Sequence, residues 1–367
     1  MKIATIELER MLQEILESTE MDESNILIVK DVYLAQTKRG LGHHDINDIV
    51  WRIFRLKLGE LKVNPVFRKI ASFGCMESWD GDKGAGELTC TFAMKKAMEL
   101  AGQHGMGLCT MRNSSHYMAS APYTMLAAKS GYIGIIIAKD PPSMGMPGYE
   151  GKIVGHSPNG YAFPTNEEWP VMLDACLAYV SGHGNLNRAV ETGQQVPAWW
   201  GVDKEGKPTT DPAELLAGTR YAIGEHKGYG YAILCEMLTG VLGKGLILDQ
   251  TEGPDGLTNN TSHTAFAIKA DGLMPMEEFK DRTSELVERL MERAPGVRIP
   301  GYRSYKSELI YEQTGEIEVS DNFILVHDYL VSNKGQLENG SITELMKAAG
   351  IKIPGSFLTA GKDIPGK

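Results

Sequence analysis

The chain has 367 residues, and its 47 acidic and 37 basic side chains give a formal net charge of −10. Nucleic acids and anionic membranes would repel such a chain unless basic residues were segregated, and no dense run of Lys or Arg occurs, so neither partner is expected. The longest strongly apolar run, residues 132–138, is also too short to span a bilayer.

Helical spacing of apolar residues predicts two helices within residues 5–35, separated by a short polar stretch. A third helix is expected near residues 43–53. Its apolar stripe consists of Ile46, Ile49, Val50 and Ile53. A helix with this stripe places His44, Asp48 and Arg52 together on another face.

The middle of the chain predicts alternating helices and strands around one long loop. The expected helices cover residues 88–101, 119–130, 229–242 and 276–293, and the expected strands cover 107–111, 132–139 and 171–174. Residues 140–160 form a loop rich in Pro and Gly, and loops of this length commonly bind ligands. Residues 182–220 are predicted to form a polar excursion. After about residue 320 the apolar residues show no period that predicts a helix or a strand.

Glycine is enriched and unevenly distributed. The 41 glycines are about 11% of the chain, against the usual ~7%. Residues 1–73 hold 3 of them and residues 74–240 hold 24. Because glycine lets the backbone approach a ligand closely, we expect a cofactor in the second stretch.

The cysteines favour a reducing compartment. Their positions, with no CxxC pair, are Cys75, Cys90, Cys109, Cys176 and Cys235. The first ten residues lack the apolar stretch of a signal peptide. The sequence therefore predicts a soluble, cytoplasmic protein.

A candidate phosphate site lies at residues 224–230, Gly-Glu-His-Lys-Gly-Tyr-Gly. No G-x-G-x-x-G occurs in the chain, which removes the usual Rossmann fingerprint. The segment nevertheless precedes an apolar helix, where free backbone N–H groups, the positive end of the helix dipole and Lys227 would suit a phosphate. The alternative is an ordinary turn with a solvated lysine.

Five segments, in their order along the chain, resemble the type 2 malate/L-lactate dehydrogenase family. They are Met111–Tyr117 (Met-Arg-Asn-Ser-Ser-His-Tyr), the Pro/Gly loop, Leu173–Ala175, Gly206–Pro212 and His226–Gly230. The resemblance covers roughly residues 5–315. It implies an α/β fold distinct from the Rossmann type, with a mostly helical N-terminal region, NAD or NADP bound by a glycine-rich central domain, and a homodimer. We accordingly expect residues 1–73 and 300–367 to form one domain, and residues 74–299 to form the cofactor-binding and catalytic region.

The resemblance also implies roles for individual residues. His116 matches the proton acceptor of some family members, and His44 matches a second proton-transfer histidine. Imidazole suits this task, since a hydroxyl proton must leave when a hydride leaves the carbinol carbon, and imidazole titrates near neutrality. The alternative for His116 is a structural histidine bonded to backbone. The positions that match cofactor contacts are Asp140, His156, Ser157, Asp174, Ala175, Cys176, His226 and Lys227.

Asp48 departs from the family pattern. Members commonly carry an arginine there, which would hold a substrate carboxylate through a bidentate pair. An aspartate would repel that carboxylate, so either the substrate lacks one at this point or another cation replaces the arginine. Arg52 is the candidate, and both Asp48 and Arg52 are assigned to substrate binding. The alternative is a surface Asp48–Arg52 pair that stabilises its helix by a few tenths of a kcal/mol.

Together these features predict an NAD(P)-dependent oxidoreductase that transfers a hydride between nicotinamide and a small hydroxy or oxo compound, such as a 2-hydroxy acid. Two alternatives are a cyclic imino acid reductase of the same family and a catalytically silent nucleotide-binding paralogue. A third is a metal-dependent hydrolase or lyase that uses His43, His44, His116 and His156, although no ligand spacing supports it. The expected partners are a small-molecule substrate and a second copy of the chain, with no metal.

Overall fold

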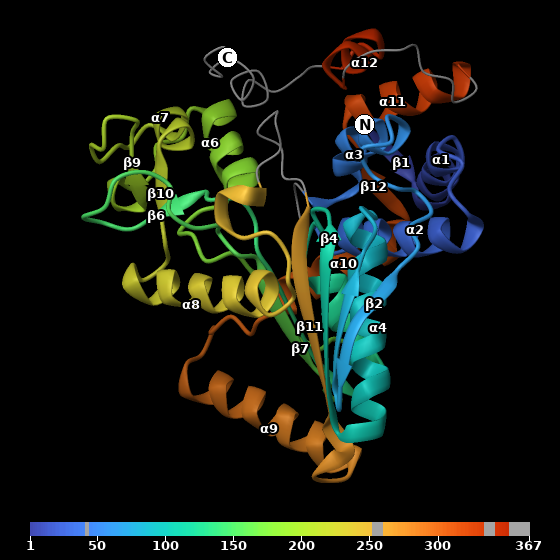
Figure 1. Cartoon of the computed structure of the whole chain (residues 1–367), viewed down its shortest axis with the longest axis vertical. Helices are drawn as coiled ribbons and strands as arrows, with labels where there is room; N and C mark the ends of the chain where they lie inside the picture. Colours follow the sequence, from blue (N-terminus) through green and yellow to red (C-terminus); the bar gives the residue numbers. More distant parts are fainter. Residues whose placement is uncertain (41–43, 252–259, 334–341, 352–367) are drawn as a thin grey trace.

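The computed structural model describes residues 1–40, 44–251, 260–333 and 342–351. A seven-stranded mixed sheet forms its centre, with strand order β2-β3-β4-β11-β5-β7-β8 (Figure 1). The strands are β2 (Arg68–Phe73), β3 (Met76–Asp80), β4 (Met106–Ser114), β5 (Tyr132–Ala138), β7 (Asn159–Phe163), β8 (Val171–Ala175) and β11 (Thr261–Lys269).

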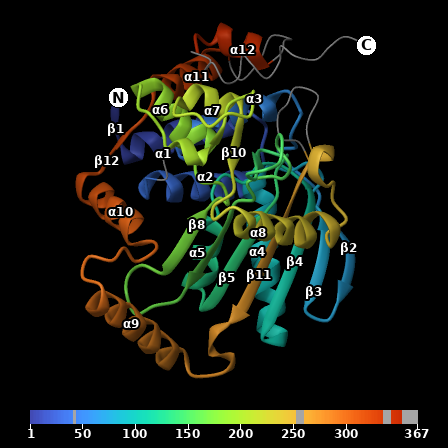
Figure 2. The same cartoon turned by 90° about the vertical axis from the view of Figure 1, so that its left-hand side faces the viewer.

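Helices cover both faces of this sheet. Helices α4 (Gly86–His104) and α5 (Ala121–Lys129) lie on one face, and α8 (His226–Glu236) crosses the other face near one end of the strands (Figure 2). Because successive strand residues point to opposite faces, Ile136 packs among the side chains of α4 and α5 while Ile137 lies under α8.

A helical layer built from both ends of the chain lies beyond one end of the sheet (Figure 1). It contains α1 (Thr5–Glu17), α2 (Glu23–Lys38), α3 (Ile49–Lys57), α11 (Asp321–Ser332) and α12 (Ile342–Ala348). Strands β1 (Lys2–Ala4) and β12 (Glu316–Glu318) pair beside α1. One apolar core joins these elements, and Leu12, Ile53, Phe323 and Leu345 are all buried in it.

A small lobe flanks the sheet on the side of α8 (Figure 1). Strand β10 (Thr219–Tyr221) pairs with β6 (Met144–Gly145) and β9 (Gly201–Val202), and the lobe also holds α6 (Asn187–Thr192) and α7 (Pro212–Ala217). The segment 182–220, which the sequence predicts as a polar excursion, therefore contains regular elements. They are too short for their periodicity to be read from one sequence.

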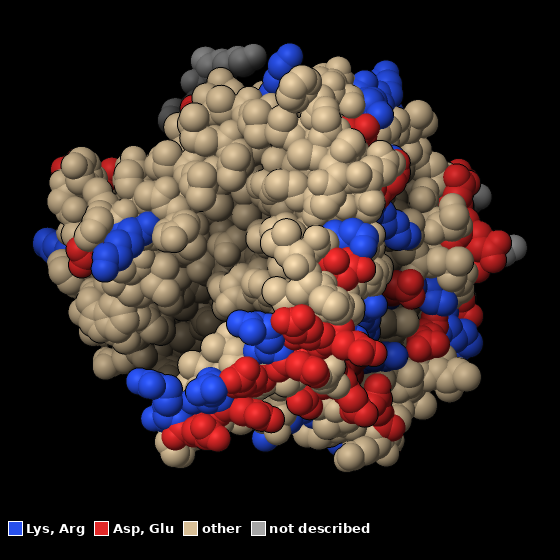
Figure 3. Space-filling model, turned by 90° about the horizontal axis from the view of Figure 1, so that it is seen from below, with Lys and Arg blue, Asp and Glu red and all other residues tan. Residues whose placement is uncertain are grey.

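Two further helices, α9 (Met276–Arg293) and α10 (Tyr302–Thr314), follow the last strand of the sheet. Helix α9 carries acidic and basic side chains in mixture, and both signs are interspersed on the lower face of the molecule (Figure 3). The same view shows a hollow between the small lobe and the rest of the protein.

The helices and strands that the sequence predicts before residue 300 are confirmed, with shifts of a few residues at most of their ends. The helix expected near residues 43–53 differs most: residue 43 lies outside the described residues, Ile46–Asp48 form a 3-10 turn, and α3 follows from Ile49. The helix expected over 229–242 is α8, continued by a π-helix over Met237–Val241. The sequence analysis misses the β2–β3 hairpin, β7, β11, α10, α11 and α12. Strand β11 is the most consequential omission, because it lies at the middle of the sheet. Residues 261–265 of this strand are buried on both faces yet include four polar side chains, so they show neither an apolar run nor an alternating pattern.

Candidate active site

The candidate residues gather where several strands meet at one edge of the sheet. Strand β11 is antiparallel to both β4 and β5, so β4 and β5 end at the edge where β11 begins. Strand β7 also begins there and β8 ends there. The ends of β4 and β5 are separated only by β11, and two strand spacings are about 10 Å. The segments after Ser114 and after Ala138 are therefore neighbours in space.

His116 and His44 face one another at this edge, with ring centroids 5.1 Å apart and planes inclined by 41°. The start of α4 fixes the backbone of His116. The Ser115 hydroxyl accepts a hydrogen bond from the N–H of Gly86 at 3.0 Å, and any side chain at Gly86 would collide with the His116 carbonyl. His43, which the metal-site alternative includes, lies outside the described residues.

Arg52 reaches this pair from α3. Its Nη1 donates to the Ser115 hydroxyl at 3.1 Å, and its Nη2 donates to the His116 carbonyl at 2.8 Å and lies 3.5 Å from Nδ1 of His116. The Arg52 side chain is only 4% exposed. The surface-pair alternative is therefore wrong, because α3 is buried on the face that carries Arg52 as well as on its apolar stripe. Its contacts favour a role in orienting His116.

Two carboxylates flank the same guanidinium. Oε1 of Glu87, in the first turn of α4, lies 3.4 Å from Nη2 of Arg52, and this side chain is fully buried. Oδ2 of Asp48 lies 4.0 Å from the same nitrogen, and its side chain is 21% exposed. Burial raises the pKa of Asp48 to about 7; Glu87 and Asp45 add to the rise, and Arg52 opposes it.

The raised pKa predicts that Asp48 costs the protein stability in its ionised form. The folded protein holds this proton more tightly than the unfolded chain does, so the cost is absent below about pH 4 and complete above about pH 7. Asp48→Asn removes the cost, and we expect it to raise the free energy of unfolding by roughly 2 kcal/mol more at about pH 8 than at about pH 5. Urea denaturation at both pH values measures this difference. The exposed Asp31→Asn on α2 is the control, and a gain that does not depend on pH would contradict the prediction.

His263 links the segment after β4 to the end of β5. This buried residue of β11 pairs with Ala138 of β5, and its Nε2 donates to the Ser115 carbonyl at 2.9 Å. Burial lowers the pKa of His263 to about 4, with Lys139 and Arg52 adding to the effect while the Ser115 carbonyl opposes it. The imidazole is therefore neutral near pH 7. Sequence reasoning misses His263 because it misses β11, although a histidine within a run of Thr, Ala and Phe is the signal that could have found it.

Asp140, His156 and Ser157 form a second cluster at the end of β5. One oxygen of Asp140 accepts the N–H of Ser157 at 2.8 Å, and the other is paired with Nδ1 of His156. The Ser143 hydroxyl donates to Asp140 at 3.2 Å. Burial alone would raise the pKa of Asp140, but His156 and the Ser157 N–H hold it below its ordinary value. The sequence predicts three of these residues but not Ser143.

The three candidates on and after β8 divide between the two faces of the sheet. The carboxylate of Asp174 accepts hydrogen bonds from the Ser120 hydroxyl at 2.7 Å and the Ala121 N–H at 3.3 Å, so it holds the start of α5. Ala175 pairs with Asn159 at the edge of the sheet, and Cys176 packs in the apolar cluster that includes α8. The structure therefore brings Ala175 and Cys176, but not the side chain of Asp174, to the α8 side.

His226 and Lys227 lie exposed at the start of α8, and one expectation for this segment is wrong. The N–H groups of Lys227, Gly228 and Tyr229 donate to carbonyls of residues 223–225 at 3.0–3.1 Å, so they are not available to a phosphate. The reason is that α8 begins at His226, earlier than predicted, and the preceding turn satisfies its first N–H groups. The exposed Lys227 ammonium and the helix dipole remain as the positive features.

A buried pair, Lys139 and Glu236, lies between the end of β5 and α8. Nζ of Lys139 lies 4.0 Å from Oε2 of Glu236, so the two charges attract one another without a direct hydrogen bond. Burial lowers the pKa of Lys139 and raises that of Glu236. Sequence reasoning misses both, since nothing in the local pattern marks either as buried.

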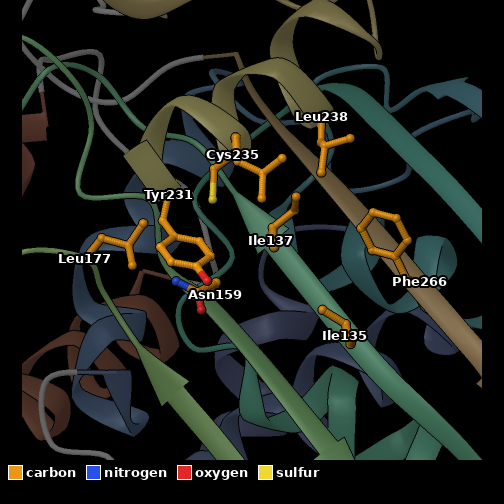
Figure 4. Close-up of a pocket in the computed structure, with 9 residues that line it drawn as sticks. Ile135, Ile137, Asn159, Leu177, Tyr231, Cys235, Leu238 and Phe266 are labelled. Carbon is orange, nitrogen blue, oxygen red and sulfur yellow. The ribbon is translucent and has the colours of Figure 1, made fainter. Parts of the chain in front are cut away.

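An apolar hollow of about 280 Å³ lies between α8 and the sheet (Figure 4). Its lining residues are Ile135, Ile137, Asn159, Leu177, Tyr231, Leu234, Cys235, Leu238 and Phe266. This volume is at the small end for ligand pockets, and the lining offers no cation for a phosphate. Within the described ranges, no helix has the length and apolar composition to cross a membrane, and no three acidic, His or Cys side chains are grouped to hold a metal.

Residues 3–325 match the malate/L-lactate dehydrogenase family. The chain belongs to this family. It is 29% identical over 315 residues to the L-sulfolactate dehydrogenase of Methanocaldococcus jannaschii, which covers 84% of this chain and 91% of the relative. It is 28% identical over 330 residues to a 2,3-diketo-L-gulonate reductase of Escherichia coli, which covers 88% and 98%.

The fold agrees with this membership. The solved structure of the M. jannaschii sulfolactate dehydrogenase superposes with a TM-score of 0.83 at 26% identity, covering 94% of this chain and all of that one. The predicted family and its α/β fold are thereby confirmed. This malate/L-lactate dehydrogenase family member is an oxidoreductase. The family and its named relatives confirm the predicted class of reaction, which is NAD(P)-dependent hydride transfer on a small hydroxy or oxo compound.

Proposed function

We propose that hydride transfer takes place at the sheet edge where β4 and β5 end. The observation that carries this proposal is that His263 joins the His116 segment to the end of β5 within one edge. The His44–His116 pair is assigned to proton transfer, and the Asp140 cluster and the start of α8 are assigned to the dinucleotide.

In this proposal His116 takes the hydroxyl proton of the substrate, and His44 lies within reach to pass it on. Bound NAD(P) supplies the hydride acceptor, or the donor in the reverse direction. Arg52 holds the His116 peptide against the start of α4, which fixes where the imidazole can point. We assign Asp48, whose carboxylate lies 4.0 Å from Arg52, to the substrate side of the same cluster.

The residues at the end of β5 fit a dinucleotide. Asp140 is held below its ordinary pKa and keeps its negative charge, as an acceptor for ribose hydroxyls requires. We assign His156, Ser157, Ala175 and Cys176 to contacts at the same edge, and His226 and Lys227 to the phosphates. Asp174 acts indirectly, by holding β8 against α5.

Lys227→Ala is expected to weaken coenzyme binding by about tenfold, because it removes an exposed cation at the positive end of α8. Fluorescence titration with NADH and with NADPH measures the two dissociation constants and shows which coenzyme is preferred. Lys204→Ala, at another exposed lysine in the small lobe, is the matched control. Unchanged affinity for both coenzymes would remove Lys227 from the site.

We also propose a homodimer in the cytoplasm. Helix α8 and the π-helix that continues it over Met237–Val241 expose a run of large apolar side chains, which are Tyr231, Leu234, Met237, Val241 and the following Leu242. Apolar patches of this kind commonly lie in protein–protein interfaces. The five cysteines, all within the described ranges, are free thiols, which is typical of a reducing compartment.

For the domains, we propose that residues 1–73 and 300–367 form one unit and residues 74–299 the other, except that β2 (Arg68–Phe73) pairs with β3 in the central sheet. The apolar core shared by α1, α3, α11 and α12 supports this division.

The test of the proposed function is a steady-state assay of nicotinamide absorbance with a panel of hydroxy acids, polyols, oxo acids and cyclic imino acids. We expect turnover with at least one class, and a cyclic imine as the best substrate would select the imino acid reductase alternative. Tight coenzyme binding without turnover on any compound would instead favour the silent paralogue.

A further inference from the structure

We infer that Asp48, beside the His44–His116 pair and Arg52, selects a substrate whose group next to the reacting carbon is a hydrogen-bond donor without negative charge, rather than a carboxylate. The inference rests on the proposed function, because it concerns the substrate of the same site. It separates this chain from relatives whose names denote acid substrates, such as sulfolactate and diketogulonate.

The carboxylate of Asp48 accepts no hydrogen bond from any described residue. Its nearest cation, Arg52, is beyond hydrogen-bond distance at 4.0 Å. Asp45, three residues earlier, is different, because its carboxylate accepts two hydrogen bonds from Asn47 and caps the following turn. Asp45 is thus committed to local structure, whereas the acceptors of Asp48 are available to a ligand.

Arg52 is the cation that could have held a substrate carboxylate. Its guanidinium is buried and already bonded to Ser115 and His116, and it also neutralises the buried Glu87. Turning it toward a substrate would break these contacts and leave Glu87 without its counter-charge, which is strongly unfavourable. Arg52 is therefore a positioning residue for His116.

A substrate that approaches Asp48 would meet an excess of negative charge. Arg52, Glu87, Asp45 and Arg55 lie close enough to act on the Asp48 carboxylate, and Arg55 is itself paired with Glu60 at 3.0 Å. With Glu60, four carboxylates thus accompany two guanidinium groups, and both guanidinium groups are already paired. An entering carboxylate would be repelled, whereas an ammonium, hydroxyl or amide N–H would be attracted to the Asp48 oxygens.

The test uses four compounds that share one carbinol and differ in one group: lactate, lactamide, 1,2-propanediol and 1-amino-2-propanol. Turnover with the preferred coenzyme is compared between the wild type, Asp48→Asn and Asp48→Arg. Calorimetry of the complexes with reduced coenzyme, which cannot react with an alcohol, ranks binding independently of turnover. Asp31→Asn is the control for loss of a surface charge.

We expect the wild type to bind lactate at least tenfold more weakly than the best of the other three. Asp48→Asn should reduce this difference in affinity, and Asp48→Arg should make lactate the tightest-binding of the four compounds. Equal or absent binding across the series, tightest binding of lactate by the wild type, or an order unaffected by both variants would overturn the inference. If the wild type turned over lactate in preference to the other three compounds, the inference would be overturned but the proposed function would stand. Absence of turnover with the whole broader panel would count against the function itself.

Discussion

Replacing His116 with alanine is expected to lower kcat by about 100-fold or more, while the dissociation constant of the coenzyme stays within about threefold of the wild-type value. The imidazole faces His44 at 5.1 Å, and its peptide is fixed by Arg52 and by the start of α4. The proposed coenzyme residues instead lie at the end of β5 and beyond. Loss of the proton acceptor should thus leave the dinucleotide site intact.

Stopped-flow measurement of hydride transfer and fluorescence titration of the coenzyme separate the two effects. His104→Ala, at an exposed histidine near the end of α4, is the matched control and should change neither quantity. A loss of coenzyme affinity as large as the loss of kcat would assign His116 a structural role, which is the alternative left open by the sequence.

Replacing Arg52 with methionine is expected to destabilise the protein by about 3–5 kcal/mol, because it leaves the fully buried Glu87 without its counter-charge. It should also lower kcat, since the His116 carbonyl and the Ser115 hydroxyl lose the guanidinium that holds them. Urea denaturation and steady-state kinetics measure the two effects.

The double variant Arg52→Met/Glu87→Gln distinguishes stability from positioning. Removing the second charge should recover much of the lost stability, because no buried carboxylate remains unpaired, whereas kcat should stay low. A variant of Arg52 that raises KM while leaving kcat unchanged would contradict the positioning role and show direct substrate binding.

The sequence predicts those parts of the fold in which burial follows a simple period. The stripe Ile46, Ile49, Val50 and Ile53 is buried as expected, and the apolar run at 132–138 forms β5. Strand β11 could not be recognised in this way, because the polar residues of its first half are buried in the middle of the sheet. The side chains of His263 and Thr264 bond to Ser114 of β4 and to the Leu238 carbonyl in the π-helix after α8, and local sequence does not reveal these partners.

The candidate site likewise contains some residues that the sequence predicts and others that it could not predict. Motif order identified His116, Asp140 and Lys227, since each belongs to a short segment with a recognisable pattern. The burial of Arg52 against Glu87 could not be foreseen, because the two residues lie on different helices, 35 positions apart in the chain. Likewise, only the backbone geometry shows that the turn before α8 uses the N–H groups that a phosphate would need.

We propose that the His116 cluster and the Asp140 cluster form one site along one edge of the sheet. A crystal structure with the coenzyme and a non-reacting substrate analogue would show both clusters with their ligands. We expect C4 of the nicotinamide to lie about 3–4 Å from the analogue carbon that corresponds to the carbinol, with the imidazole of His116 within hydrogen-bond distance of its oxygen. A nicotinamide bound away from the ends of β4 and β5, with neither His116 nor His44 near the analogue, would contradict it.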